Sequence, residues 1–281
     1  MDEEEKEGVA KRLGFTFGRV VFLIILIVSV NLAIRYVDGK LYKHDNSDND
    51  IVESNQNVHY TGYVNKLDDS KEYVYRASYD NDGIVDSYST LYKTYYLDNI
   101  VVPYINIDSE DALKVNAEIK SVYDSAIETY KKGIEDKMSY VDDCSYRFFV
   151  NDNILSVVLT YGKGATDVVH PSYYTYNFDL KTGRLVSYED IYSYVGFNSD
   201  NISQSVKSSI TTVMTERMSK FPDSLKEDFD TYNSQSYDNY ISLINDSSIK
   251  YFISSNKKLN VIVTLSIPAG TGEFDTVVTI N

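Results

Sequence analysis

The run HPSYYTYNFDLKTGRLVSYEDIY, from His170 to Tyr192, is the stretch that decides the fold. Between Tyr174 and Leu180, large apolar side chains recur at every second position, which predicts a half-buried strand. The Lys-Thr-Gly-Arg run that follows predicts a tight turn, because glycine adopts positive φ freely. Ser187, three residues before Asp190, then predicts the cap of a short helix. This stretch contains no catalytic constellation.

Upstream of this stretch, the sequence predicts one long helix and two hairpins. Apolar residues recur every three or four positions between Asp108 and Gly133, which predicts an amphipathic helix over this range. The Asn-Asp-Asn run around Asp152 separates two strand-like runs and predicts a hairpin. The Asp-Asn-Asp-Gly run that ends at Gly83 predicts another hairpin, because Asp-Gly tolerates the backbone that such turns require. A further strand is predicted at residues 97–105.

Downstream, a second amphipathic helix is predicted from about Ser199 to Lys220. Three final strands are predicted at Ile249–Ser254, Leu259–Ile267 and Phe274–Ile280. Strands, a helix and more strands, twice over, predict an α+β fold of two small halves, each a mainly antiparallel sheet packed against an amphipathic helix. The glycine-containing loop at residues 162–169 predicts their boundary, which gives domains at residues 58–165 and 166–281.

The charge of the chain is concentrated in its larger part. The formal net charge is -15, and the first 37 residues contain five basic and five acidic groups, so the excess belongs to residues 38–281. Such a domain repels nucleic acid and anionic lipid, and it attracts a cationic partner at long range. Plain solubility is the simplest explanation of most of these charges. We therefore expect no nucleic-acid partner.

An apolar run near the N-terminus, Val20 to Ile34, carries no charged residue. It predicts a single transmembrane helix at residues 20–37, since a bilayer core of ~30 Å needs about this length with some snorkelling. A cleaved signal peptide is the competing interpretation, but the sequence before Arg35 is a poor cleavage site. We expect residues 1–19 in the cytoplasm, residues 38–57 as a polar tether, and the C-terminal domain outside the cell.

Candidate binding residues are few. The three histidines, at positions 44, 59 and 170, are too scattered for a zinc site, and we expect neither a metal nor a cofactor. The single cysteine, Cys144, cannot form an intrachain disulfide. His170, Pro171 and Tyr173 are the candidate partner-binding residues, because the other large side chains of the diagnostic strand point to the core. A structural role is the alternative for His170, since one isolated histidine is a weak signal.

Three short motifs of penicillin-binding enzymes occur by chance. They are Ser199-Asp200-Asn201, Lys181-Thr182-Gly183 and two serines with lysine three residues on, Ser247 to Lys250 and Ser255 to Lys258. Their order is wrong, and both serine-lysine runs lie near predicted strands rather than at a helix start. The sequence also lacks a G-x-S-x-G elbow and a phosphate-binding glycine loop. We expect a protein that is not an enzyme.

Three runs of the second half belong together: His170-Pro171, Tyr176 to Arg184, and Glu189 to Tyr192. Together they resemble the signature of domain-of-unknown-function family 3298, which forms the C-terminal part of the ectodomain of RsiV-like anti-sigma factors. The run from Val101 to Ile105, which leads into the helix from Asp108, resembles the PdaC-like family 4163 that usually precedes it. The two resemblances together cover residues 58–281.

The resemblance implies a non-catalytic receptor domain on Gram-positive cells, and its RsiV branch binds lysozyme, a strongly basic protein. An acidic domain suits a basic ligand. We therefore expect a membrane-anchored extracytoplasmic sensor that binds a cell-wall component such as peptidoglycan or a cationic protein such as lysozyme. An anti-sigma-factor-like transmembrane regulator is the alternative, although residues 1–19 lack the amphipathic pattern of a sigma-factor-binding segment. A cell-wall hydrolase or deacetylase is disfavoured by the missing metal-ligand set.

Overall fold

The computed structural model describes residues 72–90, 93–164, 171–221, 223, 228–266 and 274–280 of the 281-residue chain. The protein is α+β, as the sequence predicts, with helices and antiparallel sheets. Val58–Asn281 forms one compact unit. Within the part of the chain that is described, no helix is long and apolar enough to cross a membrane. The predicted leader, anchor and tether at residues 1–57 lie outside that part.

The described chain contains short N-terminal elements, four helices and two larger sheets. Short elements precede the first long helix: β1 (Val74–Arg76), β2 (Ser87–Ser89), β3 (Thr94–Tyr96), η1 (Leu97–Asn99) and β4 (Pro103–Ile105). The helices are α2 (Glu110–Asp136), α3 (Tyr188–Tyr194), α4 (Ser199–Met218) and α5 (Phe229–Asn245). The central sheet has the order β5 (Tyr140–Asn151), β6 (Ile154–Gly164), β7 (Ser172–Asp179), β8 (Arg184–Leu185). The C-terminal sheet has the order β11 (Phe274–Thr279), β10 (Lys258–Leu265), β9 (Lys250–Ser254).

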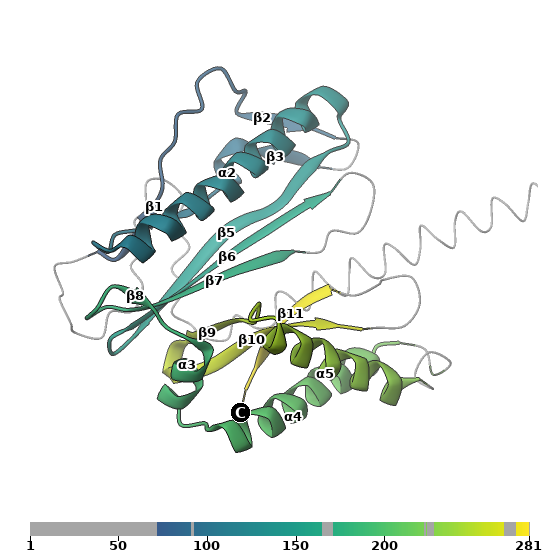
Figure 1. Ribbon diagram of the computed structural model, residues 1–281. Helices are drawn as coiled ribbons and strands as arrows, with labels where there is room; N and C mark the ends of the chain where they lie inside the picture. The colour runs from purple at the N-terminus through teal and green to yellow at the C-terminus, as the bar shows by residue number, and fades with distance from the viewer. Residues whose placement is uncertain are drawn as a thin grey trace, which may run out of the picture. The chain divides into compact units, whose positions relative to one another are not determined.

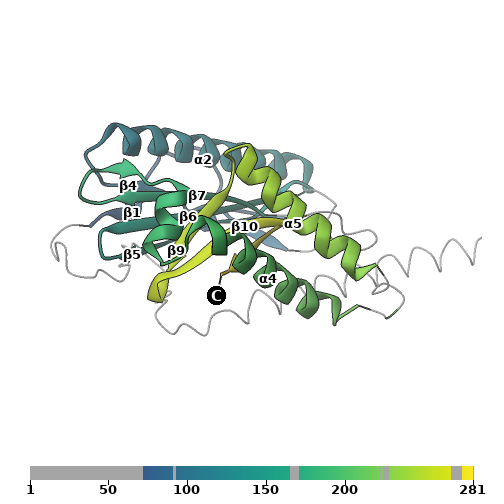
Figure 2. The same cartoon turned by 60° about the horizontal axis from the view of Figure 1, so that its bottom comes forward.

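These elements form four layers (Figures 1 and 2). Helix α2 packs on one face of the central sheet, and the other face of that sheet packs on the C-terminal sheet. Helices α4 and α5 cover the outer face of the C-terminal sheet. The alternation of side chains along β6 shows the division, because Val157 and Leu159 face α2 whereas Val158 faces the C-terminal sheet.

The central sheet joins the two halves that the sequence predicts. Strands β6 and β7 are hydrogen-bonded neighbours, from the pair of Ile154 and Asp179 to the pair of Tyr161 and Ser172. The predicted boundary between residues 165 and 166 therefore falls inside one sheet. Glycine content marks the loop between the strands, but it carries no information on whether those strands pair.

Helix α2 provides the first core. Its cap is Ser109, whose side-chain oxygen accepts a hydrogen bond from the Ala112 N–H at 3.1 Å, so the helix begins later than the prediction from Asp108. The predicted apolar stripe is confirmed by five residues that are all buried: Val115, Ile119, Val122, Ala126 and Tyr130. These side chains pack against the central sheet.

One of the two predicted hairpins is wrong. Gly83 has a φ of 80°, and the Ile84 N–H donates to the Asn81 carbonyl at 3.0 Å, so the predicted turn forms. However, β1 before the turn pairs with β4, and β2 after it pairs with β3. Turn preference acts locally, whereas the partner of a strand is selected by packing over the whole unit. The second predicted hairpin, β5 and β6, is confirmed.

Strand β7 is covered on both faces rather than half-buried. Tyr176 and Phe178 lie in the core beneath α2, as predicted. Tyr173, on the opposite face, is only 3% exposed and packs with Val158 and with Phe252 of β9. The prediction of an exposed face is wrong, because the C-terminal sheet covers it.

A polar seam joins the two sheets at this interface. The Ser156 hydroxyl donates to the Asn177 side-chain oxygen at 2.6 Å and accepts from the Ile253 N–H at 3.0 Å. The Asn177 amide donates to the Tyr251 carbonyl at 2.8 Å, and the Thr175 hydroxyl accepts from the Tyr251 N–H at 3.0 Å. Side chains of the central sheet thus satisfy the outer backbone edge of β9.

The polar seam predicts the effect of Ser156→Ala. The substitution removes the partner of two buried groups, the Ile253 N–H and the Asn177 side-chain oxygen. We therefore expect a loss of about 1–3 kcal/mol in the free energy of unfolding. Urea denaturation measures it. Ser172→Ala, at an exposed position of β7, is the matched control, with an expected change within about 0.5 kcal/mol. Equal losses in both variants would contradict the role of the seam.

Gly133 supports a second prediction. It was expected to end α2, but the helix continues to Asp136, and a Cβ at Gly133 would collide with the Ser139 carbonyl and the Tyr88 hydroxyl. Helix propensity alone would make Gly133→Ala stabilising by about 1 kcal/mol. We expect destabilisation instead, because the Tyr88 hydroxyl must give up its 2.7 Å hydrogen bond to Ser139. A rise in the melting temperature would contradict this.

Candidate functional site

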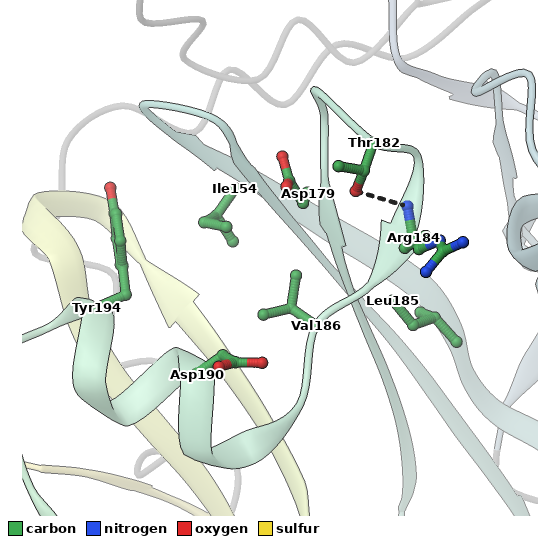
Figure 3. Close-up of a pocket in the computed structure, with 8 residues that line it drawn as sticks. All are labelled: Ile154, Asp179, Thr182, Arg184, Leu185, Val186, Asp190 and Tyr194. Atoms are coloured by element: carbon green, nitrogen blue, oxygen red, sulfur yellow. Dashed lines mark hydrogen bonds between the residues drawn. The ribbon is translucent and has the colours of Figure 1, made fainter.

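An open pocket of about 290 Å³ lies where the chain turns from β7 into β8 and then enters α3 (Figure 3). Its lining residues are Ile154, Asp179, Thr182, Arg184, Leu185, Val186, Asp190 and Tyr194. All except Ile154 come from residues 179–194. The pocket is therefore built largely by the end of the diagnostic stretch.

The turn between β7 and β8 forms one wall. The Asp179 carboxylate accepts a hydrogen bond from the Lys181 N–H at 2.8 Å, and the Asp179 carbonyl accepts one from the Gly183 N–H at 2.7 Å. Gly183 has a φ of 70°, and a Cβ at this position would lie 2.9 Å from the Cβ of Ser109. Glycine is required here both for the positive φ and for the close approach to the cap of α2.

Helix α2 also holds the strand that follows this turn. The Asp111 carboxylate, in the first turn of α2, accepts a hydrogen bond from the Leu185 N–H at 3.1 Å. Further along, the Val186 N–H donates to the Asn177 carbonyl at 2.8 Å, which fixes the path of the chain into α3. The predicted cap of α3 is confirmed, because the Ser187 side chain accepts from the Asp190 N–H at 3.1 Å.

Tyrosines hold α3 on its buried side. The Tyr251 hydroxyl donates to the Val186 carbonyl at 2.7 Å, and the hydroxyls of Tyr188 and Tyr240 lie 3.2 Å apart. Burial raises the pKa of Tyr240 and that of Tyr251 to about 12, so these hydroxyls remain protonated at neutral pH. Asp190 and Tyr194, on another side of α3, line the pocket.

An ion-pair cluster lies beside the pocket, at the turn between β5 and β6. The Tyr194 hydroxyl and the Lys257 ammonium both donate to Asp152 Oδ2, each at 2.6 Å. The Lys257 ammonium also lies 5.3 Å from the centroid of the Tyr194 ring, within the range of a cation–π interaction. Lys257 ends the 3-10 turn η3 (Ser255–Lys257), and Asp152, Asn256 and Lys257 have φ values of 50°, 60° and 58°.

Hydrogen bonds keep the carboxylates of this region charged. The bond from Lys257, followed by that from Tyr194, lowers the pKa of Asp152, and the same contact with Asp152 raises the pKa of Lys257. Burial by itself would raise the pKa of Asp179. Hydrogen bonds from the Asn153 side chain and the Lys181 N–H outweigh that effect, so the pKa of Asp179 is lowered.

The predicted binding residues do not belong to this pocket. His170 lies outside the described residues, as do His44 and His59. Pro171 is half-buried just before β7, and Tyr173 is buried between the sheets, so the expectation that the Tyr173 side chain is exposed to a partner is wrong. Neither Pro171 nor Tyr173 lines the pocket.

Sequence reasoning missed the pocket residues because it gave them structural roles. Asp179 is predicted only as a residue of the strand between Tyr174 and Leu180, and Asp190 only as part of a helix cap. Both assignments are correct locally, since Asp179 is the last residue of β7 and Asp190 bonds to Ser187. Two carboxylates that flank a glycine turn and a short helix were the available signal.

Few groups here are suited to covalent or metal chemistry. In the described ranges, no group of three or more His, Cys, Asp or Glu side chains is placed to hold a metal ion. Cys144 is buried, and burial raises the pKa of its thiol to about 12. Ser199-Asp200-Asn201 forms the first turn of α4 behind its cap, and Lys181-Thr182-Gly183 forms the turn after β7.

No protein-family model matches the chain, and no curated protein is similar to it in sequence.

The ion pair of Asp152 and Lys257 predicts a pH-dependent coupling. Because the folded-state pKa of Asp152 lies below its ordinary value, its contribution to stability is present above that value and is lost as pH falls through the folded-state pKa. In a double-mutant cycle of Asp152→Asn and Lys257→Gln, measured by urea denaturation, we expect favourable coupling at neutral pH and a smaller coupling in acid, below the ordinary pKa of an aspartate. Asparagine is chosen at position 152 because it tolerates positive φ.

The matched control for this cycle replaces Lys257→Gln by Lys258→Gln, at the neighbouring exposed position. We expect no coupling between Asp152 and Lys258 at either pH. Coupling between Asp152 and Lys257 that persists unchanged in acid would show that the contact is not an ion pair.

Proposed function

We propose that the protein is a membrane-anchored, extracytoplasmic, non-enzymatic binding domain that recognises a cationic protein of the lysozyme kind. Peptidoglycan is the alternative ligand. The anchor is assigned to Val20–Ile34, by its uncharged apolar sequence, and residues 58–281 form the binding domain. The anti-sigma-factor alternative depends on residues 1–19, which lie outside the described residues, and no observation in the described part favours it.

The pocket is the observation that carries this proposal. It is built from the segment that carries the resemblance to the RsiV-like ectodomain, and the carboxylates of Asp179 and Asp190 lie at its edge. The cluster of Asp152 and Lys257 lies next to it. A formal charge of -15 in residues 38–281 adds a long-range attraction for any basic partner.

The composition of the predicted tether supports the proposal of a receptor. Residues 38–57 are rich in Asp, Asn and Ser, and such a composition separates a folded domain from a membrane surface. A negatively charged domain is also repelled by anionic lipid headgroups, which leaves its surface available to soluble ligands.

Calorimetric titration of the full chain, reconstituted in lipid nanodiscs, tests the proposal. The probes are egg-white lysozyme and soluble muramyl-peptide fragments of peptidoglycan, and cytochrome c serves as a basic control protein. We expect lysozyme to bind at micromolar or lower concentration, with an affinity that falls as salt shortens the Debye length from about 10 Å at 0.1 M. Cytochrome c is expected to bind much more weakly.

Two results would contradict the proposal in different ways. If neither lysozyme nor the muramyl peptides bind at low salt, the receptor function fails. If cytochrome c binds as tightly as lysozyme, the domain attracts basic proteins through net charge alone, without a specific site.

A further inference from the structure

The pocket beside α3 has an apolar base with a carboxylate at either end. Figure 3 shows the side chains of Ile154 and Val186 between Asp179 on one side and Asp190 on the other, with the Tyr194 ring beside them. Ile154 is 5% exposed, and Val186 packs against the second core, so this base is firmly held. An apolar base next to carboxylates matches a side chain that has an aliphatic stem and a cationic head.

Hydrogen bonds orient the carboxylates of Asp179 and Asp190 and leave each of them able to accept further hydrogen bonds. Asp179 Oδ1 accepts bonds from the Asn153 side chain and the Lys181 N–H, which orient the group. Asp190 Oδ2 accepts a bond from the Ser187 hydroxyl at 2.7 Å. A carboxylate has lone pairs for about four hydrogen bonds, so each group can accept more from a ligand.

This corner of the protein already holds one ammonium group. Lys257 lies with its Nζ 2.6 Å from Asp152 Oδ2 and 5.3 Å from the centroid of the Tyr194 ring. Tyr194 also lines the pocket. The carboxylate and the aromatic ring that hold Lys257 are therefore an internal example of the chemistry that the pocket offers to a ligand.

The charged side chains of the pocket leave a small negative excess. The lining residues include two carboxylates, Asp179 and Asp190, and one cation, Arg184, so the lining has a net charge of -1. The neighbouring Lys181 charge also acts on Asp179, where it helps to lower the pKa. Figure 3 shows the Arg184 guanidinium directed away from Ile154 and Val186. The balance suits one additional cation rather than several.

We propose that this pocket receives a single lysine or arginine side chain from the surface of a basic partner protein. The methylene stem lies over Ile154 and Val186, and the charged head is bound by the carboxylate at one end of the pocket, Asp179 or Asp190. The inference rests on the proposed function, since it identifies where the receptor domain engages its cationic ligand.

The test compares two double variants of the full chain in nanodiscs. Asp179→Asn with Asp190→Asn neutralises the pocket and keeps oxygen acceptors for the bonds from Lys181 and Ser187. Asp98→Asn with Asp238→Asn neutralises two exposed residues on other elements, η1 and α5. Both variants change the net charge equally, so the long-range field changes equally.

Egg-white lysozyme and a decalysine peptide are the probes, titrated by calorimetry at low salt. We expect the pocket variant to bind both probes about tenfold more weakly than the wild type, and the control variant less than about twofold more weakly. Equal weakening in the two variants would overturn the pocket inference while the receptor function stands. Binding of muramyl peptides alone would overturn the choice of a protein ligand.

A second variant keeps the test decisive if the double substitution lowers the melting temperature. Thr182→Lys places an ammonium at the lining of the pocket and leaves both carboxylates intact, so it should compete with the ligand and weaken binding about tenfold. Thr212→Lys, on the exposed side of α4, adds the same charge elsewhere. Wild-type affinity in Thr182→Lys would overturn the inference. If the wild type binds none of lysozyme, decalysine and the muramyl peptides, the proposed function itself fails.

Discussion

The hydrogen bonds that Ser156 and Asn177 make with β9 are the contacts on which the rest of the structure depends. A sheet edge packed against an apolar face leaves backbone groups unpaired, and each such group costs about 1–3 kcal/mol. Here the side chains of the central sheet supply the missing partners at Tyr251 and Ile253. The C-terminal sheet, with α4 and α5 behind it, is thereby fixed to the central sheet in one position.

Local sequence signals predicted the elements that depend on neighbouring residues. The apolar stripe of α2, the β5–β6 hairpin, the glycine turn at Gly183 and the Ser187 cap are all found. Each follows from a periodicity, a backbone preference or a side chain within a few positions. The partner of β1 and the burial of Tyr173 depend on segments far away in the sequence. Alternating residues on a strand do not show whether a second sheet will cover the remaining face.

The candidate site could not be predicted either, because it too depends on segments that are distant in the sequence. Asp179 and Asp190 have local roles that account for them fully in the sequence, and only the return of the chain through Gly183 brings them to opposite ends of one pocket. Ile154 and Asp152 come from an earlier hairpin, which meets the pocket because β6 pairs with β7. The pocket therefore exists only where both predicted halves of the chain are assembled.

The backbone at Lys257 has a consequence for the evolution of this surface. Its φ of 58° is a conformation that glycine adopts without strain, and most other residues at such a position lower the stability of a protein. Glycine at position 257 would relax the backbone, but it would remove the ammonium that Asp152 and Tyr194 hold. Backbone strain and the ion pair therefore oppose each other at Lys257, so a substitution that relaxes the backbone also loses the contact with Asp152.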